Sequence, residues 1–237
     1  MNFSIIIPVL NEKNNINKLA SKISNYLKKF KYEIIFIDDS SNDGSKDILL
    51  KLRKKFKKIK VIFRNKNNRD LSQSCRDGFE KASFNNLIVM DGDLQHNPKY
   101  LPKMISIYRK NKCDFVIGAR DLTSKRVKSL SVTRQTASII LVKLFDFLFG
   151  YKTIDPMSGY FIFKKKIYRK NKRKLFLKGF KILADLIYCE KNFKIKDYVI
   201  KFDYRKKGKS KLNFKILLIL LQFIILRFLQ NILILNK

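Results

Sequence analysis

Short apolar runs recur five times in the first 120 residues, and each run is followed by a turn. The runs are Phe3–Ile7, Glu33–Ile37, Lys60–Phe63, Leu87–Met90 and Asp114–Ile117. Four of the five are followed by a helical pattern. Short strands that alternate with helices are typical of a parallel sheet with crossover connections. The sequence therefore predicts an α/β fold with a mostly parallel central sheet flanked by helices.

Apolar residues between these runs recur at helical spacing and form single stripes that can pack against the sheet. Proline at position 98 favours the start of the third helix. The three stripes are Ile16, Leu19, Ala20, Ile23, Leu27 and Phe30; Ile48, Leu49, Leu52 and Phe56; and Leu101, Met104, Ile105 and Tyr108.

Two longer apolar segments follow in the second half of the chain. The pattern over 129–149 predicts a helix that is too short to span a bilayer. Its apolar second half is expected to be buried in the core, and a face that touches a membrane is the alternative. The segment 212–235 is interrupted by polar residues such as Arg227, which favours a helix lying on a membrane surface after the basic stretch 205–211. A single membrane span and a helix docked on the core are the alternatives. The predicted division is a catalytic domain over 1–211 and a membrane-associated helix over 212–237.

The composition limits the partners without choosing one. A length of 237 residues fits one domain, and a net charge of +34 attracts polyanions such as nucleic acid, anionic lipid or phosphorylated substrates. Abundant surface lysine is the simpler explanation for much of this charge. The three cysteines have no CxxC spacing, which argues against disulfides and zinc and favours a reducing compartment. The first ten residues lack a basic leader and are interpreted as a strand.

Polar residues gather just beyond the predicted strand ends. These clusters are Asn11-Glu12, Asp38-Asp39, Asp91-Gly92-Asp93 and Arg120-Asp121. In open α/β sheets ligands bind beyond the carboxyl ends of the strands, so the clusters are expected to converge on one site.

The acidic turn after the fourth run is the strongest candidate for chemistry. Asp91 and Asp93 alternate around one turn and can share a hard cation such as Mg²⁺ or Mn²⁺ with substrate phosphate oxygens. Phosphate-binding glycine loops of the two common patterns are missing, so a metal is expected to neutralise a diphosphate. The stretch Asp38–Gly44 offers carboxylates that can hydrogen-bond a base or ribose, and Asn42 or Asp43 is expected to cap the next helix. The single histidine, His96, is given no role.

Several motifs in the same order resemble a known family. The runs SIIIPVLNE (Ser4–Glu12), IDDSSNDG (Ile37–Gly44) and VMDGDLQHNP (Val89–Pro98) are similar to family 2 inverting glycosyltransferases with the GT-A fold. Later motifs resemble the polyprenyl-phosphate branch of that family, of which dolichyl-phosphate mannose synthase is typical. These motifs are Gly118-Ala119-Arg120, Arg134, DPMSGYF (Asp155–Phe161) and FDYRKKGKSKL (Phe202–Leu212).

The resemblance implies roles for individual residues. Positions that hold the nucleotide are matched by Pro8, Leu10, Glu12, Ile37 and Asp39. Asp91, Asp93 and Gln95 match the metal group, and Gly92 lies beside the diphosphate. The basic positions around the donor diphosphate and acceptor phosphate are matched by Arg120, Arg134, Arg205 and Lys211. Asp155 matches an acidic position near the reacting centre, so that Asp93, Asp155 and Arg120 are the predicted catalytic residues. Arg69-Asp70-Leu71-Ser72 departs from the glycine-rich pattern of many members, which leaves the sugar open.

The resemblance implies transfer of a hexose from GDP-mannose or UDP-glucose to a polyprenyl phosphate on the cytoplasmic face of a membrane. An anionic lipid phosphate needs no strong base, and the reaction instead needs cations that hold two anions together. A family 2 enzyme acting on a sugar hydroxyl is the alternative, and it would require a base such as Asp155. A nucleic-acid-binding module rests on charge alone and lacks a recognition motif, so no nucleic-acid partner is expected.

Overall fold

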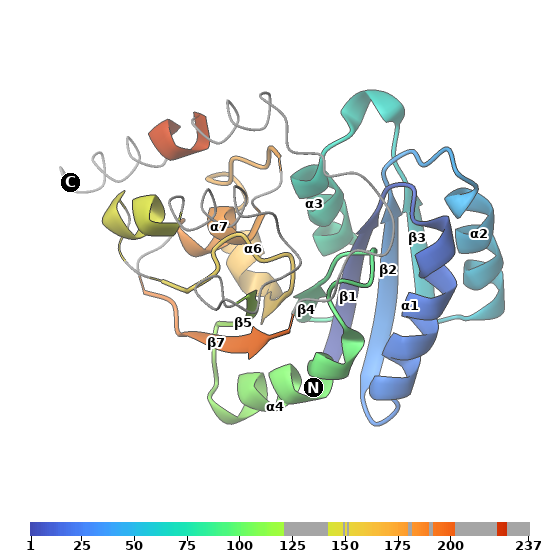
Figure 1. Ribbon diagram of the computed structural model, residues 1–237, viewed down its shortest axis with the longest axis horizontal. Coiled ribbons are helices and arrows are strands. Elements are labelled where there is room, and N and C mark those ends of the chain that lie inside the picture. Colours follow the sequence, from blue (N-terminus) through green and yellow to red (C-terminus); the bar gives the residue numbers. More distant parts are fainter. Residues whose placement is uncertain are drawn as a thin grey trace.

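The computed structural model describes residues 1–120, 142–148, 150, 152–179, 182–189, 192–201 and 222–226. A central sheet runs through this part of the chain, with helices on both of its faces (Figure 1). The Arg134, Arg205 and Lys211 positions, Asp121 and most of the predicted tail helix lie outside the described residues.

The sheet has seven strands in the order β3-β2-β1-β4-β6-β5-β7. Their bounds are β1 Asn2–Val9, β2 Lys31–Asp38, β3 Ile59–Phe63, β4 Asn86–Val89, β5 Phe115–Arg120, β6 Phe161–Lys164 and β7 Ile195–Ile200. Strands β1 to β4 pair in parallel, β7 pairs in parallel with β5, and β6 is antiparallel to both of its neighbours. The predicted α/β fold with a mostly parallel sheet is therefore confirmed.

One face of the sheet is covered by the three helices that the apolar stripes predicted. These are α1 (Lys13–Tyr26), α2 (Ser45–Lys55) and α4 (Leu101–Lys110), the last preceded by the 3₁₀ turn η2 (Pro98–Tyr100). Alternate residues of β1, Ile5 and Ile7, lie in one core cluster with Ile16 of α1 and Leu49 of α2. A strand that is buried on both faces sends successive side chains to opposite cores, which explains the nearly unbroken isoleucine run of β1.

The opposite face is covered by α3 (Leu71–Lys81), α6 (Lys165–Asn171) and α7 (Ile182–Ile187). No stripe predicted α3, because its buried face consists mainly of small residues. A Cβ on Gly78 would lie 2.6 Å from Ile6 Cγ2, so the absence of a side chain lets the helix approach the sheet. Small and polar residues on a buried face hide the apolar period that sequence reasoning relies on.

An aromatic cluster within this second core connects α3 to β6 and β5. The Phe163 ring on β6 packs against Phe79 of α3 at 5.1 Å and against Phe115 of β5 at 5.7 Å between centroids. Such ring pairs add stabilisation beyond the area they bury. The antiparallel strand β6 is thereby fastened both to the helix layer and to its neighbouring strand.

The two apolar segments are only partly described, and both lie at the end of the molecule far from α1 and α2 (Figure 1). Residues 142–148 form a helix in which Phe145 is fully buried while Phe147 is 86% exposed. The prediction of a buried second half is therefore wrong for Leu144 and Phe147, because this helix is amphipathic. In the helical residues 222–226, Phe223 and Ile224 are buried and Ile225 and Leu226 are exposed. Among the helices of the described residues, none has the length and apolarity needed to cross a bilayer.

Candidate active site

The carboxyl ends of β1, β2 and β4 meet at one edge of the sheet, as the sequence predicted. The Asp39 N–H donates to the Val9 carbonyl at 2.9 Å, and the Met90 N–H donates to the Ile6 carbonyl at 3.2 Å. A Cβ on Gly92 would lie 3.2 Å from the Pro8 carbonyl oxygen and 3.5 Å from Glu12 Cγ. The acidic turn after β4 therefore lies directly against the loop after β1.

The loops after β1 and β2 are tied together by side-chain caps. Asn11 Oδ1 accepts the Asn42 N–H at 2.9 Å, and the Asn11 N–H donates to Ser41 Oγ at 2.9 Å. Asp43 accepts the Lys13 N–H with Oδ2 and the Ser45 N–H with Oδ1, both at 2.9 Å, so one carboxylate serves the first turns of α1 and α2. The N-cap of α2 is Gly44, so the prediction that Asn42 or Asp43 takes this position is wrong. Asp43 lies one residue earlier and accepts the first N–H of the helix, while Asn42 bonds to Asn11. Hydrogen bonds to the charged form lower the pKa of Asp43 although burial opposes them.

The acidic turn begins with Asp91, whose carboxylate meets the buried His96. His96 Nδ1 lies 3.3 Å from the Asp91 backbone nitrogen and 3.1 Å from Asp91 Oδ2. When Nδ1 carries no proton it accepts the Asp91 N–H, and when it carries one it donates to Asp91 Oδ2. Asp93 Oδ1 accepts the Gln95 N–H at 3.1 Å, and Leu94 has a positive φ of 65° that tightens the turn. His96 thus positions the turn, a role that sequence reasoning missed.

Gly159, from the DPMSGYF motif, makes room for the Asp91 carboxylate. A Cβ at this position would lie 2.7 Å from Asp91 Oδ1 and 2.8 Å from Oδ2. Any larger residue would push the carboxylate away. The connection before β6 is thereby brought against the turn after β4, nearly 70 residues earlier in the sequence.

Asp39 is almost fully buried after β2 and pairs with Arg64, which follows β3. Burial raises the pKa of Asp39, and the charge and hydrogen bond of Arg64 oppose that rise. Arg64 Nε also contacts Asp77 Oδ2 at 2.9 Å, and its side chain is 6% exposed. The site therefore contains a buried cation that the sequence reasoning did not single out.

Arg120 and Asp155 form a buried ion pair at the end of β5. Arg120 Nε and Nη2 donate to the two Asp155 oxygens at 2.7 and 2.8 Å, and the Arg120 N–H adds a third bond at 3.1 Å. Asp155 has no exposed surface. Burial disfavours the Arg120 charge, but Asp155 and then Asp91 outweigh it and raise the Arg120 pKa. The sequence predicted that Arg120 follows the fifth strand. In the structure Arg120 is instead the last residue of β5.

Cys75 is a buried thiol in the first half of α3. Burial raises the Cys75 pKa, and the negative charges of Asp91, Asp70 and Asp39 raise it further, while Arg64 lowers it. The three cysteines are free and buried.

The residues present fit a hard divalent cation. Asp91 and Asp93 supply carboxylates and Gln95 an amide oxygen, which are the ligand types that Mg²⁺ and Mn²⁺ prefer. Gly159 has no side chain that would displace the Asp91 carboxylate from this position. Within the ranges that the structure describes, no group of three His, Cys, Asp or Glu side chains forms a complete protein site. An ion here would share its coordination with substrate oxygens.

The other predicted nucleotide positions lie close by. Pro8 of β1 pairs with Ile37 of β2, and Ile37 is fully buried in the core beside α3. Leu10 follows β1 and is partly buried. Glu12 Oε2 accepts from Asn15 Nδ2 at 2.6 Å. These side chains surround the ends of β1 and β2.

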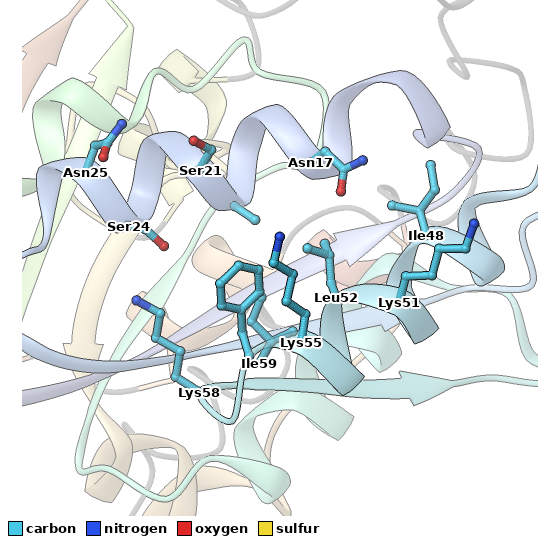
Figure 2. Close-up of a pocket in the computed structure, with 12 residues that line it drawn as sticks. Asn17, Ser21, Ser24, Asn25, Ile48, Lys51, Leu52, Lys55, Lys58 and Ile59 are labelled. Carbon is cyan, nitrogen blue, oxygen red and sulfur yellow. The ribbon is translucent and has the colours of Figure 1, made fainter.

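A groove of about 610 Å³ lies elsewhere, between the second halves of α1 and α2 (Figure 2). Lys51, Lys55 and Lys58 contribute to its lining, which contains no acidic residue. Ile59 at the beginning of β3 also lines it, so it lies toward the opposite edge of the sheet from Asp39 and Asp91. The groove is separate from the candidate active site.

The arrangement of strands and the acidic turn define a class of protein. The fold is similar to that of glucosyl-3-phosphoglycerate synthase from Mycobacterium tuberculosis, solved in complex with Mn²⁺, uridine-diphosphate and phosphoglyceric acid. The TM-score is 0.65, with 16% identity over 87% of this chain and 72% of that chain. The same enzyme solved with UDP alone gives a TM-score of 0.66 over 97% of this chain and 79% of that chain, with 15% identity.

Residues 4–171 match the family model described as Glycosyl transferase family 2, and the chain belongs to that family. It is 34% identical over 223 residues to the dolichol-phosphate mannosyltransferase of Pyrococcus furiosus. This match covers 91% of the chain and 60% of the relative's length. The dolichol-phosphate mannosyltransferase of Saccharomyces cerevisiae is 30% identical over 93% of the chain and 84% of that relative.

Proposed function

We propose that this protein transfers a hexose, mannose in the first place, from a nucleotide diphosphate sugar to a polyprenyl phosphate at the cytoplasmic face of a membrane. The observation that carries this proposal is the acidic turn after β4, which lies against the loop after β1 and beside Gly159. The two relatives named as dolichol-phosphate mannosyltransferases support mannose and a lipid phosphate. The structural neighbour that was solved with Mn²⁺ and uridine-diphosphate supports a metal-bound nucleotide donor.

The donor nucleotide is assigned to the ends of β1 and β2. Asp39 offers a buried carboxylate acceptor for base or ribose hydrogen bonds, and Arg64 holds it in place. Leu10 and Glu12 are proposed to border the nucleotide, whereas the side chains of Pro8 and Ile37 are buried within β1 and β2. Burial makes these polar contacts stronger than they would be in water.

The diphosphate is assigned to the turn after β4, where Gly92 allows close approach and Asp91, Asp93 and Gln95 would hold Mg²⁺ or Mn²⁺. When bound, such an ion stabilises the negative charge of the departing nucleoside diphosphate. His96 and Gly159 keep Asp91 oriented toward this position. Arg120 adds a fixed positive charge whose field reaches Asp91.

The reaction is an in-line displacement at the anomeric carbon. An oxygen of the acceptor phosphate forms a bond to that carbon while the bond to the diphosphate oxygen breaks, and the nucleoside diphosphate leaves with the electron pair. The configuration inverts. Because the acceptor is already anionic, no side chain has to remove a proton. Arg134, Arg205 and Lys211 are proposed to neutralise the donor diphosphate and the acceptor phosphate.

The state of Asp155 favours the phosphate acceptor over a sugar hydroxyl. A general base must lie within hydrogen-bond reach of the proton that it removes. Asp155 is fully buried, and both of its oxygens accept from Arg120. Its supported role is to fix Arg120 beside the acidic turn.

An apolar surface at one end of the molecule supports contact with a membrane. Phe147 and Ile225 are 86% and 58% exposed, and Leu144 and Leu226 are exposed as well. These residues come from the two helices that lie at the same end of the molecule (Figure 1). Exposed apolar side chains can insert among lipids, and the positive charge of the protein attracts it to an anionic lipid surface.

The decisive experiment supplies the purified chain with membranes and radiolabelled GDP-mannose or UDP-glucose, with and without Mn²⁺ or Mg²⁺. A lipid-extractable, metal-dependent product is expected, with GDP-mannose as the better donor. Asp93→Ala should abolish transfer and leave the fold intact. Asp47→Ala, an exposed carboxylate in the first turn of α2, is the matched control and should retain activity. Metal-dependent transfer that survives Asp93→Ala would refute the metal assignment, and a water-soluble glycan product would favour the hydroxyl acceptor.

A further inference from the structure

The segment after β3, where the chain departs from its family's glycine-rich pattern, is held by an unusual number of side-chain contacts. Arg64 donates from Nη1 to the Asp70 carbonyl at 3.1 Å and to Ser74 Oγ at 3.0 Å, in addition to its pair with Asp39. Arg69 donates from Nε to the Asp39 carbonyl at 3.1 Å. Both arginines therefore connect this segment to the residue that is assigned to the donor nucleotide.

Asp70 is where this segment meets a distant part of the chain. Its Oδ1 accepts the Gln73 N–H at 3.1 Å, which caps α3, and its Oδ2 accepts the Gly179 N–H at 2.6 Å. Ser72 completes the junction, because its N–H and hydroxyl donate to the Gly179 carbonyl at 3.0 and 2.9 Å. A residue with two carboxylate oxygens thus has two separate hydrogen-bonding tasks.

The partner segment, residues 176–179, is itself built for this contact. Gly179 has a φ of +80° and Leu177 a φ of +50°. The carboxylate of the buried Asp185 accepts the Phe176 and Leu177 N–H groups at 3.1 and 2.9 Å. Gln73 Nε2 donates to the Leu177 carbonyl at 2.9 Å. A turn that is fixed from both sides is a rigid anchor for the segment across from it.

We infer that Asp70 is a positioning residue of the donor site, which holds Asp39 and Arg64 in their binding geometry by anchoring the segment 64–73 to Gly179. This inference rests on the proposed function and names a further residue for it. A glycine at position 70 would offer neither oxygen, so the contact to Gly179 is a property of this chain. The Asp70 charge also acts on Asp39, whose pKa is raised mainly by burial.

The two tasks of Asp70 can be separated by two substitutions. Asn is as good a helix N-cap as Asp, so Asp70→Asn keeps the cap of α3. Its amide has an NH2 group in place of the second oxygen, so an asparagine that keeps the cap puts this donor against the Gly179 N–H and loses that bond. Asp70→Ala loses both bonds. A purely structural role in capping predicts an effect from Ala alone, whereas positioning predicts that Asn is sufficient to disturb donor binding.

The test measures binding of GDP and UDP to the full chain in the presence of Mn²⁺ by calorimetry, together with KM and kcat for the donor. Asp70→Asn is expected to weaken nucleotide binding and raise the donor KM by about tenfold, because a segment released from Gly179 leaves Asp39 in its binding geometry in a smaller fraction of the molecules. The effect on kcat and on the acceptor KM should be smaller. The urea midpoint should fall slightly for Asp70→Asn, which loses the bond to Gly179, and further for Asp70→Ala, which also loses the cap of α3.

The outcomes distinguish this inference from the proposed function. If the wild-type chain binds neither GDP nor UDP, the proposed function fails. If the wild type binds nucleotide and Asp70→Asn binds it equally well, the positioning role is overturned while the proposed function stands. Ser72→Ala provides a second variant, because it removes one bond to the Gly179 carbonyl and should shift the donor KM in the same direction by a smaller factor.

Discussion

The two parts of the sheet are built in different ways. In the N-terminal part, up to α4, each strand is followed by its own helix, and the buried Glu33 is paired with a cation, Lys60. In the C-terminal part, β6 is inserted antiparallel between β4 and β5, and the half-buried Asp197 of β7 accepts from the neutral groups of Thr153 and Ile154. The first part resembles a repeated pattern, whereas the second depends on contacts between distant residues.

The difference shows how the candidate site is assembled. Strand ends of the N-terminal part supply Asp39 and Asp91, the residues proposed to bind the donor and the metal. The C-terminal part supplies Gly159, which lies against Asp91, and Gly179, which accepts hydrogen bonds from the segment after β3 and donates one to it. The candidate site is therefore assembled from both parts of the sheet.

Phe163→Ala is expected to have the largest effect, because Phe163 joins the two parts through Phe79 and Phe115. Removing a fully buried phenylalanine should lower the free energy of unfolding by about 3–5 kcal/mol. Phe56→Ala is the control, since that ring is 38% exposed and should cost less than about 1 kcal/mol. Urea titrations measure both. Equal losses for the two variants would show that Phe163 does not join the parts.

Arg120→Met should destabilise the protein by about 3 kcal/mol, because it leaves the buried Asp155 carboxylate without its cation. The Arg120 backbone N–H still donates to Asp155, which places the loss at the lower end of the usual range. Adding Asp155→Leu should restore part of the lost stability, since an apolar pair avoids burying a charge. A double variant that is less stable than Arg120→Met would contradict this account.

Gly159→Ala is expected to act on activity more than on stability. The added methyl would displace the Asp91 carboxylate, and a misplacement of about 1 Å can cost on the order of 100-fold in rate. The measurement is kcat/KM for donor transfer, with the urea midpoint as a check on folding. In a background of Asp91→Ala the same change should cause no further loss, because its target is gone.

The smallest expected effect is an opposite pH dependence of the carboxylates of the buried Glu33 and the half-buried Asp197. Burial opposes ionisation of Glu33, but bonds from Lys60, Ser4 and the Ser83 backbone leave its pKa below 4.5. Its contribution to stability is present above pH 4.5 and is lost as pH falls through the folded pKa. Burial raises the pKa of Asp197 above 3.8, so its contribution grows as pH falls through the raised value.

Urea midpoints between about pH 3 and 7 test this sign difference. The stability advantage of the wild type over Glu33→Gln should shrink in acid, whereas its advantage over Asp197→Asn should increase. If the stability advantage of the wild type changed with pH in the same direction for both variants, Lys60 would not explain the difference between Glu33 and Asp197.

The sequence by itself determined the architecture of the N-terminal part and the place of the acidic turn. Its strands are continuous apolar runs, and its helices α1, α2 and α4 carry clear apolar stripes, so local periodicity was sufficient. Because the strands are parallel, their polar ends had to meet at one edge. Asp39 and Asp91 could be assigned to one site for this reason, and the family motifs added the metal group and the basic positions.

Only the tertiary structure decided what fixes those residues. The helix α3 was hidden because four of the five buried residues on it are small, namely Ser72, Ser74, Cys75 and Gly78, and Phe79 alone is large and apolar. The pairing of Arg64 with Asp39, of Arg120 with Asp155 and of Asp70 with Gly179 joins residues 25 to 109 positions apart. Periodicity reports which face of an element is buried, but it carries no information about which distant partner satisfies a buried charge. That choice depends on how the chain packs in three dimensions.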